Sequence, residues 1–365
     1  MHKSTSRFLR PKDENKRIVW YNIVSDCAKR KAIKDSGFMN ILILSAGTRD
    51  KVVEYFKREI NGKGKIVATD CSNLAPAVYE ADEFYLVPRI NTEGYIDKIL
   101  DICRKEQIDG VFSLIDPELS MLAKEADRFR EIGCTPIVSD YELVEKCFNK
   151  YEMAKVFRNN GLDTAKCYLD AEEFKKAMEA GEISYPVFVK PVCGSASLHI
   201  NKVNSDEELM GLFHMYDDLM IQEYMSGQEY GADVYIDMIS GKCTDIFVKK
   251  KIKMRAGETD KSVSYKDRVL FDKIKNFVEA EDFRGMIDID IFDIDGKYYF
   301  SEVNPRFGGG YPHAYECGVN MPKAVINNLE GRENPVRIGE YKTDICMMKY
   351  NEVMIKDMNG TELVP

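Results

Sequence analysis

A carboxylate, an amide and a guanidinium alternate in the segment 302–306, and two further carboxylates, Asp288 and Asp290, precede that segment across a turn. Because strand side chains alternate between the faces of a sheet, Glu302 and Asn304 point one way, and the two aspartates also share a face. Oxygen donors of this type suit Mg²⁺, which combines one or two carboxylates with phosphate oxygens. The two segments therefore predict a metal site made of Asp290, Glu302 and Asn304, beside a bound nucleotide.

The turn at 295–296 decides whether the acidic side chains of the two segments face the same side. A strict two-residue Asp-Gly loop would place Glu302 opposite Ile289 and turn Asp290 to the other face. The metal site therefore requires an odd-numbered loop or a β-bulge. We expect a three-residue loop over 295–297, which puts Asp290 directly opposite Glu302 and leaves the glycine at a bulge position.

A second segment offers groups that bind phosphate. Lys190 follows the apolar run 187–189, and Gly194 and Ser195 lie in the loop of small residues after it. An ammonium and free backbone N–H groups at such a place can surround phosphate oxygens, although a lone lysine at a strand end is more often a solvated charge. The P-loop pattern GxxxxGK[ST] is absent from the chain.

A third segment suits an aromatic base. The apolar strand pattern at 220–221 runs into Gln222, Glu223, Tyr224 and Met225, whose backbone and apolar walls match a planar adenine, and Glu229 can accept hydrogen bonds from ribose hydroxyls. Taken alone, the same stretch also fits an ordinary strand end followed by a turn.

The elements that must carry these residues follow two different patterns. From 39 to 140, short apolar runs alternate with helical patterns, which predicts a small doubly wound parallel sheet. The expected strands are 41–44, 65–69, 85–87, 110–115 and 135–138, and the expected helices are 51–60, 95–106 and 118–132.

Beyond a helical stretch at 140–161, the pattern changes to hairpins, which predicts an antiparallel α+β region over 141–330. The expected strands are 187–190, 220–224, 229–239, 243–250, 286–293 and 297–303, and the expected helices are 206–216, 268–281 and 314–329. Residues 331–365 form a tail with a strand-like piece around 345–350. Residues 1–38, with ten basic and four acidic side chains, are a basic extension of unknown role.

Composition excludes several classes of protein. The 365 residues carry 52 basic and 61 acidic side chains, a net charge of −9, which disfavours nucleic acid and anionic membranes as main partners. No apolar run reaches the length of a membrane helix. The ten cysteines include no CxxC pair, and the chain shows no secretory signal, which favours reduced thiols and a cytoplasmic location.

The order of these motifs resembles the ATP-grasp superfamily, in its branch near the carbamoyl-phosphate synthase large chain and biotin carboxylase, over roughly 39–329. The resemblance implies an ATP-grasp fold preceded by the small parallel domain. It also implies roles for named residues: Lys150, Lys190, Gly194 and Ser195 at the phosphates, 222–225 at adenine, Glu229 at ribose, Asp290, Glu302 and Asn304 at the metal, and Arg255 and Arg306 at phosphate or substrate. Two departures are a loop at 193–197 that is poor in glycine and Asp290 where many relatives have glutamate.

The resemblance implies an ADP-forming ligase that uses ATP with Mg²⁺ or Mn²⁺. It would activate a small-molecule or peptide carboxylate as an acyl phosphate and join it to an amine, and a homodimer is compatible with this activity. Asp116 and Glu118 are candidate acceptor contacts, and His313 is a candidate base. Two alternatives are a carbamoyl-phosphate-synthase-type enzyme or fragment, which uses bicarbonate and ammonia, and a non-catalytic ATP-binding protein.

Overall fold

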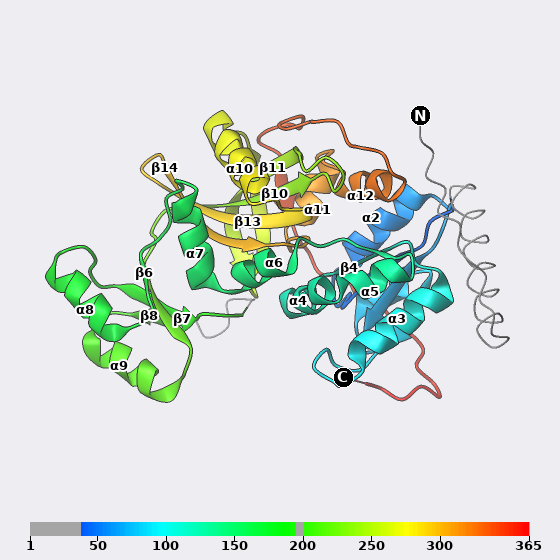
Figure 1. The fold of residues 1–365 in the computed structure, drawn as a ribbon, viewed down its shortest axis with the longest axis horizontal. Coiled ribbons are helices and arrows are strands. Elements are labelled where there is room, and N and C mark those ends of the chain that lie inside the picture. The colour runs from blue at the N-terminus through cyan, green and yellow to red at the C-terminus, as the bar shows by residue number, and fades with distance from the viewer. Residues whose placement is uncertain (1–37, 195–200, 365) are drawn as a thin grey trace, which may run out of the picture.

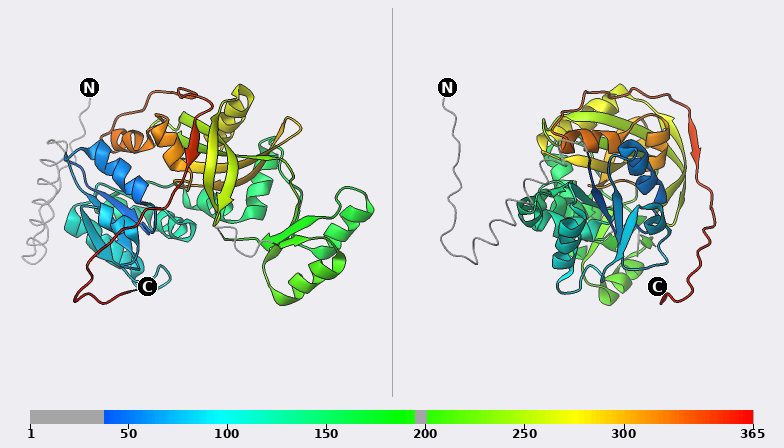
Figure 2. Two further views of the ribbon diagram at one scale, coloured as in Figure 1. Left: turned by 180° about the vertical axis from the view of Figure 1, so that it is seen from behind. Right: turned by 90° about the vertical axis from the view of Figure 1, so that its right-hand side faces the viewer.

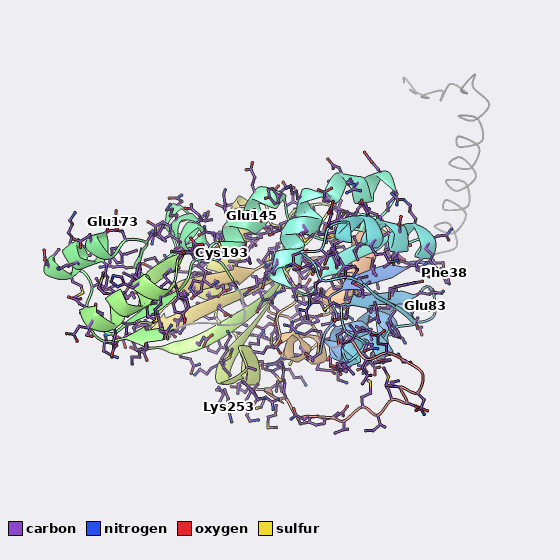
Figure 3. The ribbon with its side chains drawn as sticks, turned by 90° about the horizontal axis from the view of Figure 1, so that it is seen from below. Phe38, Glu83, Glu145, Glu173, Cys193 and Lys253 are labelled. Carbon is purple, nitrogen blue, oxygen red and sulfur yellow. The ribbon has the colours of Figure 1, made fainter. Side chains whose placement is uncertain are left out.

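The computed structural model describes residues 38–194 and 201–364, and the predicted extension 1–38 lies outside these residues except for Phe38. The described chain forms three units along an elongated molecule (Figure 1). Glu83 of the amino-terminal domain and Glu173 of a small lobe lie toward opposite ends, with a large antiparallel sheet between them (Figure 3). No helix among the described residues is long and apolar enough to cross a membrane.

The amino-terminal domain is a five-stranded parallel sheet in the order β3-β2-β1-β4-β5. The strands are β1 (Ile41–Leu44), β2 (Ile66–Asp70), β3 (Glu83–Leu86), β4 (Gly110–Ser113) and β5 (Thr135–Pro136). The helical elements are α2 (Asp50–Ile60), the 3-10 helix η1 (Pro76–Glu80), α3 (Tyr95–Glu106), α4 (Asp116–Lys124) and α5 (Ala126–Glu131).

Helices cover both faces of this sheet because the side chains of β1 are apolar on both sides. Ile41 and Ile43 belong to the core that includes α2, whereas Leu42 and Leu44 belong to the core that includes α3 and α4. Strands buried on both faces read as continuous apolar runs. The predicted doubly wound arrangement is confirmed.

Two helices, α6 (Tyr141–Phe148) and α7 (Lys150–Asn159), join this domain to the small lobe. Asn149 between them is extended, and its side chain accepts the N–H of Glu152 at 3.0 Å, which caps α7. The lobe is a four-stranded antiparallel sheet in the order β6-β9-β7-β8 with two helices. Its elements are β6 (Cys167–Tyr168), α8 (Ala171–Glu179), β7 (Val187–Pro191), β8 (Asn201–Val203), α9 (Asp206–Met215) and β9 (Leu219–Glu223).

The third unit is a six-stranded antiparallel sheet in the order β14-β13-β10-β11-β12-β15. Its strands are β10 (Gln228–Ile236), β11 (Cys243–Arg255), β12 (Glu258–Tyr265), β13 (Gly285–Ile294), β14 (Lys297–Asn304) and β15 (Cys346–Met348). The accompanying helices are α10 (Arg268–Ala280), α11 (Tyr311–Glu316) and α12 (Met321–Leu329).

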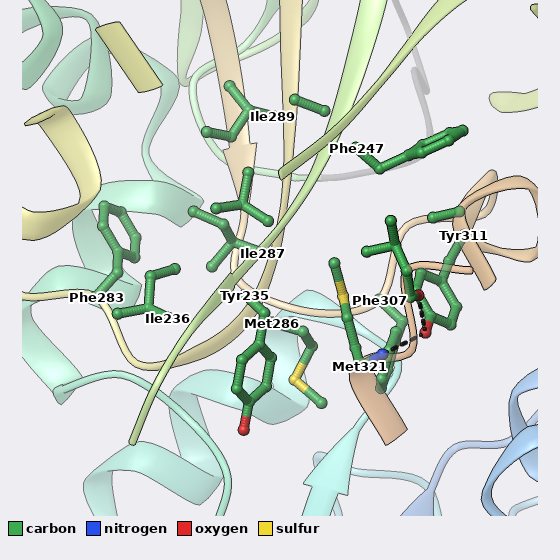
Figure 4. Packing of buried hydrophobic residues seen from close by; sticks show 14 of the residues in the cluster. Tyr235, Ile236, Phe247, Phe283, Met286, Ile287, Ile289, Phe307, Tyr311 and Met321 are labelled. Carbon is green, nitrogen blue, oxygen red and sulfur yellow. Dashed lines mark hydrogen bonds between the residues drawn. The ribbon is translucent and has the colours of Figure 1, made fainter. Parts of the chain in front are cut away.

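Apolar side chains of this large sheet pack against the loop and helices that follow β14 (Figure 4). Ile287 and Ile289 of β13 are fully buried in the same core as Tyr311. The Tyr311 hydroxyl donates to the carbonyl of Val319 at 3.2 Å and accepts the N–H of Met321 at 2.9 Å, so that it fixes the turn between α11 and α12. The end of the large sheet is therefore tied firmly to the segment after Asn304.

The carboxyl-terminal segment returns from the large sheet to the amino-terminal domain (Figure 2). β15 pairs with β12, so the strand-like piece predicted around 345–350 is confirmed. Farther on, the Ser72 hydroxyl donates to the carbonyl of Val364 and the Asn73 amide donates to the carbonyl of Glu362, each at 2.6 Å. The segment therefore bridges the two larger units.

Several predicted elements differ from those observed. The single helix expected at 118–132 is two helices, α4 and α5, and the one expected at 314–329 is α11 and α12 with a turn between them. The strand expected at 229–239 ends at Ile236, and the next residue, Asp237, accepts N–H groups of Ile239 and Ser240 in the turn that follows. β12 and α8 were not predicted.

Candidate functional site

The acidic segments form the hairpin β13–β14, and its register differs from the expected one. Ile294 pairs with Lys297, so the connection is a two-residue loop and the predicted three-residue loop is wrong. A bulge farther along shifts the register, and Asp290 then pairs with Glu302. The metal site required either an odd-numbered loop or a β-bulge, and it is the bulge that brings the two carboxylates to one face. Asp288 lies opposite Asn304 by the same register.

Two buried lysines from β11, which no motif indicated, reach this acidic face. The Lys251 ammonium lies 2.6 Å from a carboxylate oxygen of Asp290 and 2.7 Å from one of Glu229. Lys249 forms an ion pair with Asp233 and lies 3.8 Å from Asp288. Both lysines lie almost completely out of contact with solvent.

Gly231 allows the lysines to cross the strand that separates them from the aspartates. It lies on β10, opposite Lys249 on one side and Asp290 on the other. A Cβ at position 231 would lie 3.1 Å from Cε of both Lys249 and Lys251. Since real Cβ atoms rarely come so close to other atoms, a larger residue here would push the lysines away from their acidic partners.

Burial and charge act in opposite directions on these groups. Burial opposes the charge on Lys251, but Asp290 and Glu229 outweigh it and raise the pKa of the ammonium. Burial raises the pKa of Asp288 despite Lys249, and burial likewise raises the pKa of Glu302 against the opposing effect of Lys150. A further positive charge near Asp288 and Glu302 would therefore stabilise their ionised carboxylates.

The two lysines assigned to phosphate lie next to Glu302. Lys150, the first residue of α7, has its ammonium 3.9 Å from the Glu302 carboxylate and donates to the carbonyl of Gly194. Lys190, at the end of β7, is buried, and burial lowers the pKa of its ammonium, with Glu302 opposing and Lys150 adding to the shift. The structure thus places Lys190 in the interior rather than at a solvated edge. Ser195 lies outside the described residues.

The residues predicted to bind the base lie at the end of β9. Gln222 is buried and its amide lies 3.7 Å from the sulfur of Cys167, while the Glu223 carboxylate accepts the N–H of Lys166 at 3.1 Å. The Tyr224 ring packs 5.1 Å from the ring of Phe188. Met225 follows, half-buried. The binding of adenine by 222–225 stays a prediction, whereas Glu229 contacts Lys251 beside the acidic side chains.

Arginines from two units lie beyond Asn304. Nη2 of Arg306 donates to Asp116 of the amino-terminal domain at 3.0 Å, and its Nε lies 2.9 Å from the second oxygen of that carboxylate. Arg49, which no motif indicated, pairs with Glu258 at 2.7 Å. Arg255 is half-exposed, 3.2 Å from Asp260.

A cavity of about 200 Å³ lies beside the acidic side chains, Lys251, Arg49 and Arg306, and within the described part of the chain Lys150, Lys190 and 222–225 do not line it. It is polar and lies between the amino-terminal domain and the large sheet. Arg255 does not line it, so the structure does not bring the two predicted catalytic arginines together. The lining residues are Arg49, Leu114, Ile115, Asp116, Lys251, Met254, Ala256, Gly257, Glu258, Thr259, Asp288, Asp290, Glu302, Asn304, Arg306, Gly309 and Gly310.

The carboxylate and amide oxygens of the site suit a hard divalent cation only when a bound phosphate supplies further oxygen ligands. Among the described residues, no three histidine, cysteine or carboxylate side chains are grouped closely enough to hold a metal on their own. Asp290 and Glu302, with the amide of Asn304 beside them, supply two carboxylates on one face. Because Mg²⁺ commonly combines one or two carboxylates with phosphate oxygens, this donor set fits Mg²⁺ bound with a polyphosphate.

Two other candidates have structural roles. Both ring nitrogens of the buried His313 are hydrogen-bonded, to Ser262 at 2.8 Å and to the carbonyl of Ile345 at 3.0 Å, and burial lowers its pKa to about 4. The Glu118 carboxyl is buried and accepts hydrogen bonds from Tyr95 and Ser113. The geometry therefore favours neither His313 as a base nor Glu118 as an acceptor contact, whereas Asp116 lines the cavity.

Two models of known protein families match parts of this chain. Residues 41–137 match the family model of the PylC-like N-terminal domain, and residues 147–310 match that of the ATP-grasp domain. The chain is 26% identical over 259 residues to the carbamoyl phosphate synthase large chain of Agathobacter rectalis, covering 64% of this chain and 22% of that one. It spans about a quarter of the length of the carbamoyl phosphate synthase chains that it matches.

A shorter relative and a solved structure are also similar. The coenzyme γ-F420-2:α-L-glutamate ligase of Methanococcus maripaludis is 26% identical over 213 residues, covering 53% of this chain and 70% of that one. The biotin carboxylase domain of Hydrogenobacter thermophilus 2-oxoglutarate carboxylase, solved with MgADP, ADP and bicarbonate, has a TM-score of 0.69 at 19% identity, covering 85% of this chain and 73% of that one.

Proposed function

Since the chain carries an ATP-grasp domain behind a PylC-like amino-terminal domain, we propose that it is an ATP-dependent, ADP-forming carboxylate–amine ligase. The observation that carries this proposal is the polar cavity lined by Asp290, Glu302 and Arg306. Lys150 and Lys190 lie beside Glu302, on the side of the small lobe. Phosphoryl transfer depends mainly on neutralising charge and on positioning, and these side chains supply both.

The proposed reaction has two steps. An oxygen of the substrate carboxylate attacks the γ-phosphorus of ATP, and the bond to the β–γ bridging oxygen breaks to release ADP and leave an acyl phosphate. The amine then attacks the acyl carbon, phosphate leaves, and the amine loses a proton as the amide forms. No acid–base triad is needed for the first step, because the attacking carboxylate carries no proton to remove.

The chain's own residues would divide this work along the cavity. Lys150 and Lys190 neutralise the phosphates at the end near the small lobe. Asp290, Glu302 and Asn304 would hold Mg²⁺ or Mn²⁺, which when bound supplies positive charge to the transferred phosphoryl group. Arg306, held by Asp116, presents a fixed positive charge to the substrates at the other end of the cavity. The residues 222–225 and Glu229 are proposed for adenine and ribose.

The proposal also covers the size of the substrates, the location of the protein and its oligomeric state. The substrates would be small molecules or peptides, since a cavity of about 200 Å³ fits no folded partner. A cytoplasmic location and a homodimer accord with this activity, and nucleic acid and membranes have no part in it. The proposed units are 39–140, 141–330 and the segment 331–365.

The experiment that tests the proposal is ADP release from Mg-ATP in the presence of separate substrate pools. The pools are amino acids, dipeptides, small carboxylic acids, and bicarbonate with ammonia. Stimulation by one pool supports a ligase, and carbamoyl phosphate formed in the last pool would instead identify the carbamoyl-phosphate-synthase alternative. Nucleotide binding with no stimulation by any pool would favour the non-catalytic alternative.

A further inference from the structure

Arg49 occupies a position in its helix that general rules do not favour for arginine. It is the N-cap residue of α2, where Ser, Thr, Asp and Asn are preferred, and its side chain makes no capping hydrogen bond. A positive charge at a helix amino terminus is also unfavourable, because the helix dipole is positive there. A residue that breaks local rules without a local benefit is often placed for function.

The Arg49 side chain instead extends across the interface between two units. Its Nη2 lies 2.7 Å from the Glu258 carboxylate, at the start of β12, and its Nη1 donates to the carbonyl of Phe307 at 3.2 Å. Glu258 also pairs with Lys349 of the carboxyl-terminal segment at 2.8 Å. A Cβ at position 309 would lie 2.6 Å from the Glu258 carboxyl carbon, so Gly309 leaves the space that this arrangement needs.

Arg49 and Arg306 are held unusually close together for two cations. Nη1 of Arg306 donates to the same Phe307 carbonyl, also at 3.2 Å. Since both nitrogens lie 3.2 Å from one oxygen, they are no more than about 6.4 Å apart. Burial lowers the pKa of Arg49, Glu258 opposes this shift, and repulsion from Arg306 adds to it. An anion placed between the two guanidiniums would remove this repulsion.

The two arginines differ in how many of their guanidinium N–H groups are already used in contacts within the protein. Arg306 directs its N–H groups to Asp116, to the amide oxygen of Asn304 at 3.1 Å and to Phe307. Arg49 makes only its contacts with Glu258 and Phe307 among the described residues, although a guanidinium has five N–H groups. Arg49 is therefore the better placed of the two to bind an additional anion.

The charges at this end of the cavity are balanced before a substrate binds. The positive charges are those of Arg49, Arg306 and Lys349, and the negative ones are those of Asp116, Glu258 and Asp288. This end also differs from the one proposed for the phosphates: Lys150 pairs with Glu302, whereas Arg306 pairs with Asp116 and Arg49 pairs with Glu258. An anion here is a part of the substrate other than the reacting phosphate.

We propose that Arg49 binds a carboxylate of the amine substrate that does not react, so that the enzyme takes amino acids or peptides as acceptors in preference to simple amines. This inference rests on the proposed ligase function and adds the substrate class. With its carboxylate held between Arg49 and Arg306, the acceptor would direct its amine along the cavity toward Asn304 and the acyl phosphate. Arg49 is thus a binding and specificity residue contributed by the amino-terminal domain.

The test compares free acids with their carboxamides as acceptors. ADP release is measured with Mg-ATP and pools of amino acids and dipeptides, each supplied as the acid and as the amide with the same side chains, over a common set of small carboxylic acids. The variants are Arg49→Gln, Arg49→Lys, and as a matched control Arg89→Gln, an exposed arginine of the same domain. Calorimetric binding of Mg-ADP verifies that each variant keeps its nucleotide site.

We expect the wild type to use acids and not amides. Arg49→Gln should raise KM for the stimulating acid by roughly 10- to 150-fold, as expected for the loss of a hydrogen bond to a charged group, with kcat changed far less. Arg49→Lys should recover part of the affinity, and Arg89→Gln should match the wild type. Equal use of acids and amides, or an unchanged KM in Arg49→Gln, would overturn the inference while leaving the ligase function intact. Failure of every pool to stimulate the wild type would overturn both.

Discussion

Replacing Lys190 by methionine should change the stability and the nucleotide affinity of the protein in opposite directions. Lys190 is 6% exposed, and among the residues that the structure describes no hydrogen bond or ion pair to its ammonium is found. Burial lowers its pKa, which means that the fold disfavours its charge. Methionine has similar length and no charge, and a buried polar group without a partner costs about 1–3 kcal/mol. The ligand-free variant should therefore be more stable by about that amount.

The same substitution should weaken Mg-ADP or Mg-ATP binding. A hydrogen bond to a charged group contributes about 1.5–3 kcal/mol, so losing one such contact with phosphate should weaken binding by roughly 100-fold at the upper end. At a nucleotide concentration 100 times the wild-type Kd, binding stabilises the wild type by about 2.7 kcal/mol. A variant with a 100-fold higher Kd gains only about 0.4 kcal/mol under the same conditions.

Thermal unfolding with and without nucleotide, together with isothermal calorimetry, measures both effects. Lys175→Met is the matched control, because Lys175 is an exposed lysine of α8 in the same lobe. That control should leave both the ligand-free stability and the nucleotide-induced gain unchanged. If Lys190→Met bound nucleotide as tightly as the wild type, Lys190 would have no role at the phosphates and the reasoning from its burial would be refuted.

Three further outcomes are expected. Glu302→Gln should keep the far-ultraviolet circular dichroism spectrum and lose about 100-fold or more of cation-dependent ADP release, and normal turnover would remove Glu302 from the metal site. Asp116→Asn should destabilise the protein by about 3 kcal/mol, because it leaves Arg306 buried without its partner, and in a double-mutant cycle with Arg306→Gln measured by urea unfolding the two effects should fail to add. Burial opposes the charge on Asp237, but hydrogen bonds from Asn328 and others outweigh it and lower its pKa to about 2. Its stabilising contribution is therefore present above pH 4 and should fall by about 2 kcal/mol as the pH drops to 2, a fall that Asp237→Asn should not show.

The sequence predicts the parts of the fold that depend on local periodicity. β1 and α3 were placed residue for residue, because a continuous apolar run and a 3.6-residue repeat with a glycine before it leave little choice. The break at Glu125 was not predictable, since it depends on which surface each half-helix packs against. The break before α12 was missed although the sequence marks it, with Gly318 at positive φ and Asn320 as the N-cap of a helix that has a proline in its first turn. β12 was missed because its side chains are largely polar and its burial comes from neighbouring strands.

The candidate site divides in the same way. Acidic residues two apart on a strand are visible in the sequence, and the hairpin brings them together. Lys249 and Lys251 look like part of a solvated basic run, and only the glycine at 231 and the acids beyond it make them interior residues. Arg49 is separated from its contact Phe307 by more than two hundred residues, so its role depends on how two units meet.

The bulge in β14 also affects how this chain should be aligned with others. Before the bulge, Ile291 pairs with Phe300, and after it Asp290 pairs with Glu302, so Ser301 is the extra residue. Removing Ser301 would leave Asp290 opposite Glu302 in a regular ladder. Ser301 is thus a position at which a deletion preserves the site. An alignment that fixes the spacing of the two acids would misplace a relative without the bulge by one residue, and a gap at Ser301 would restore the correspondence.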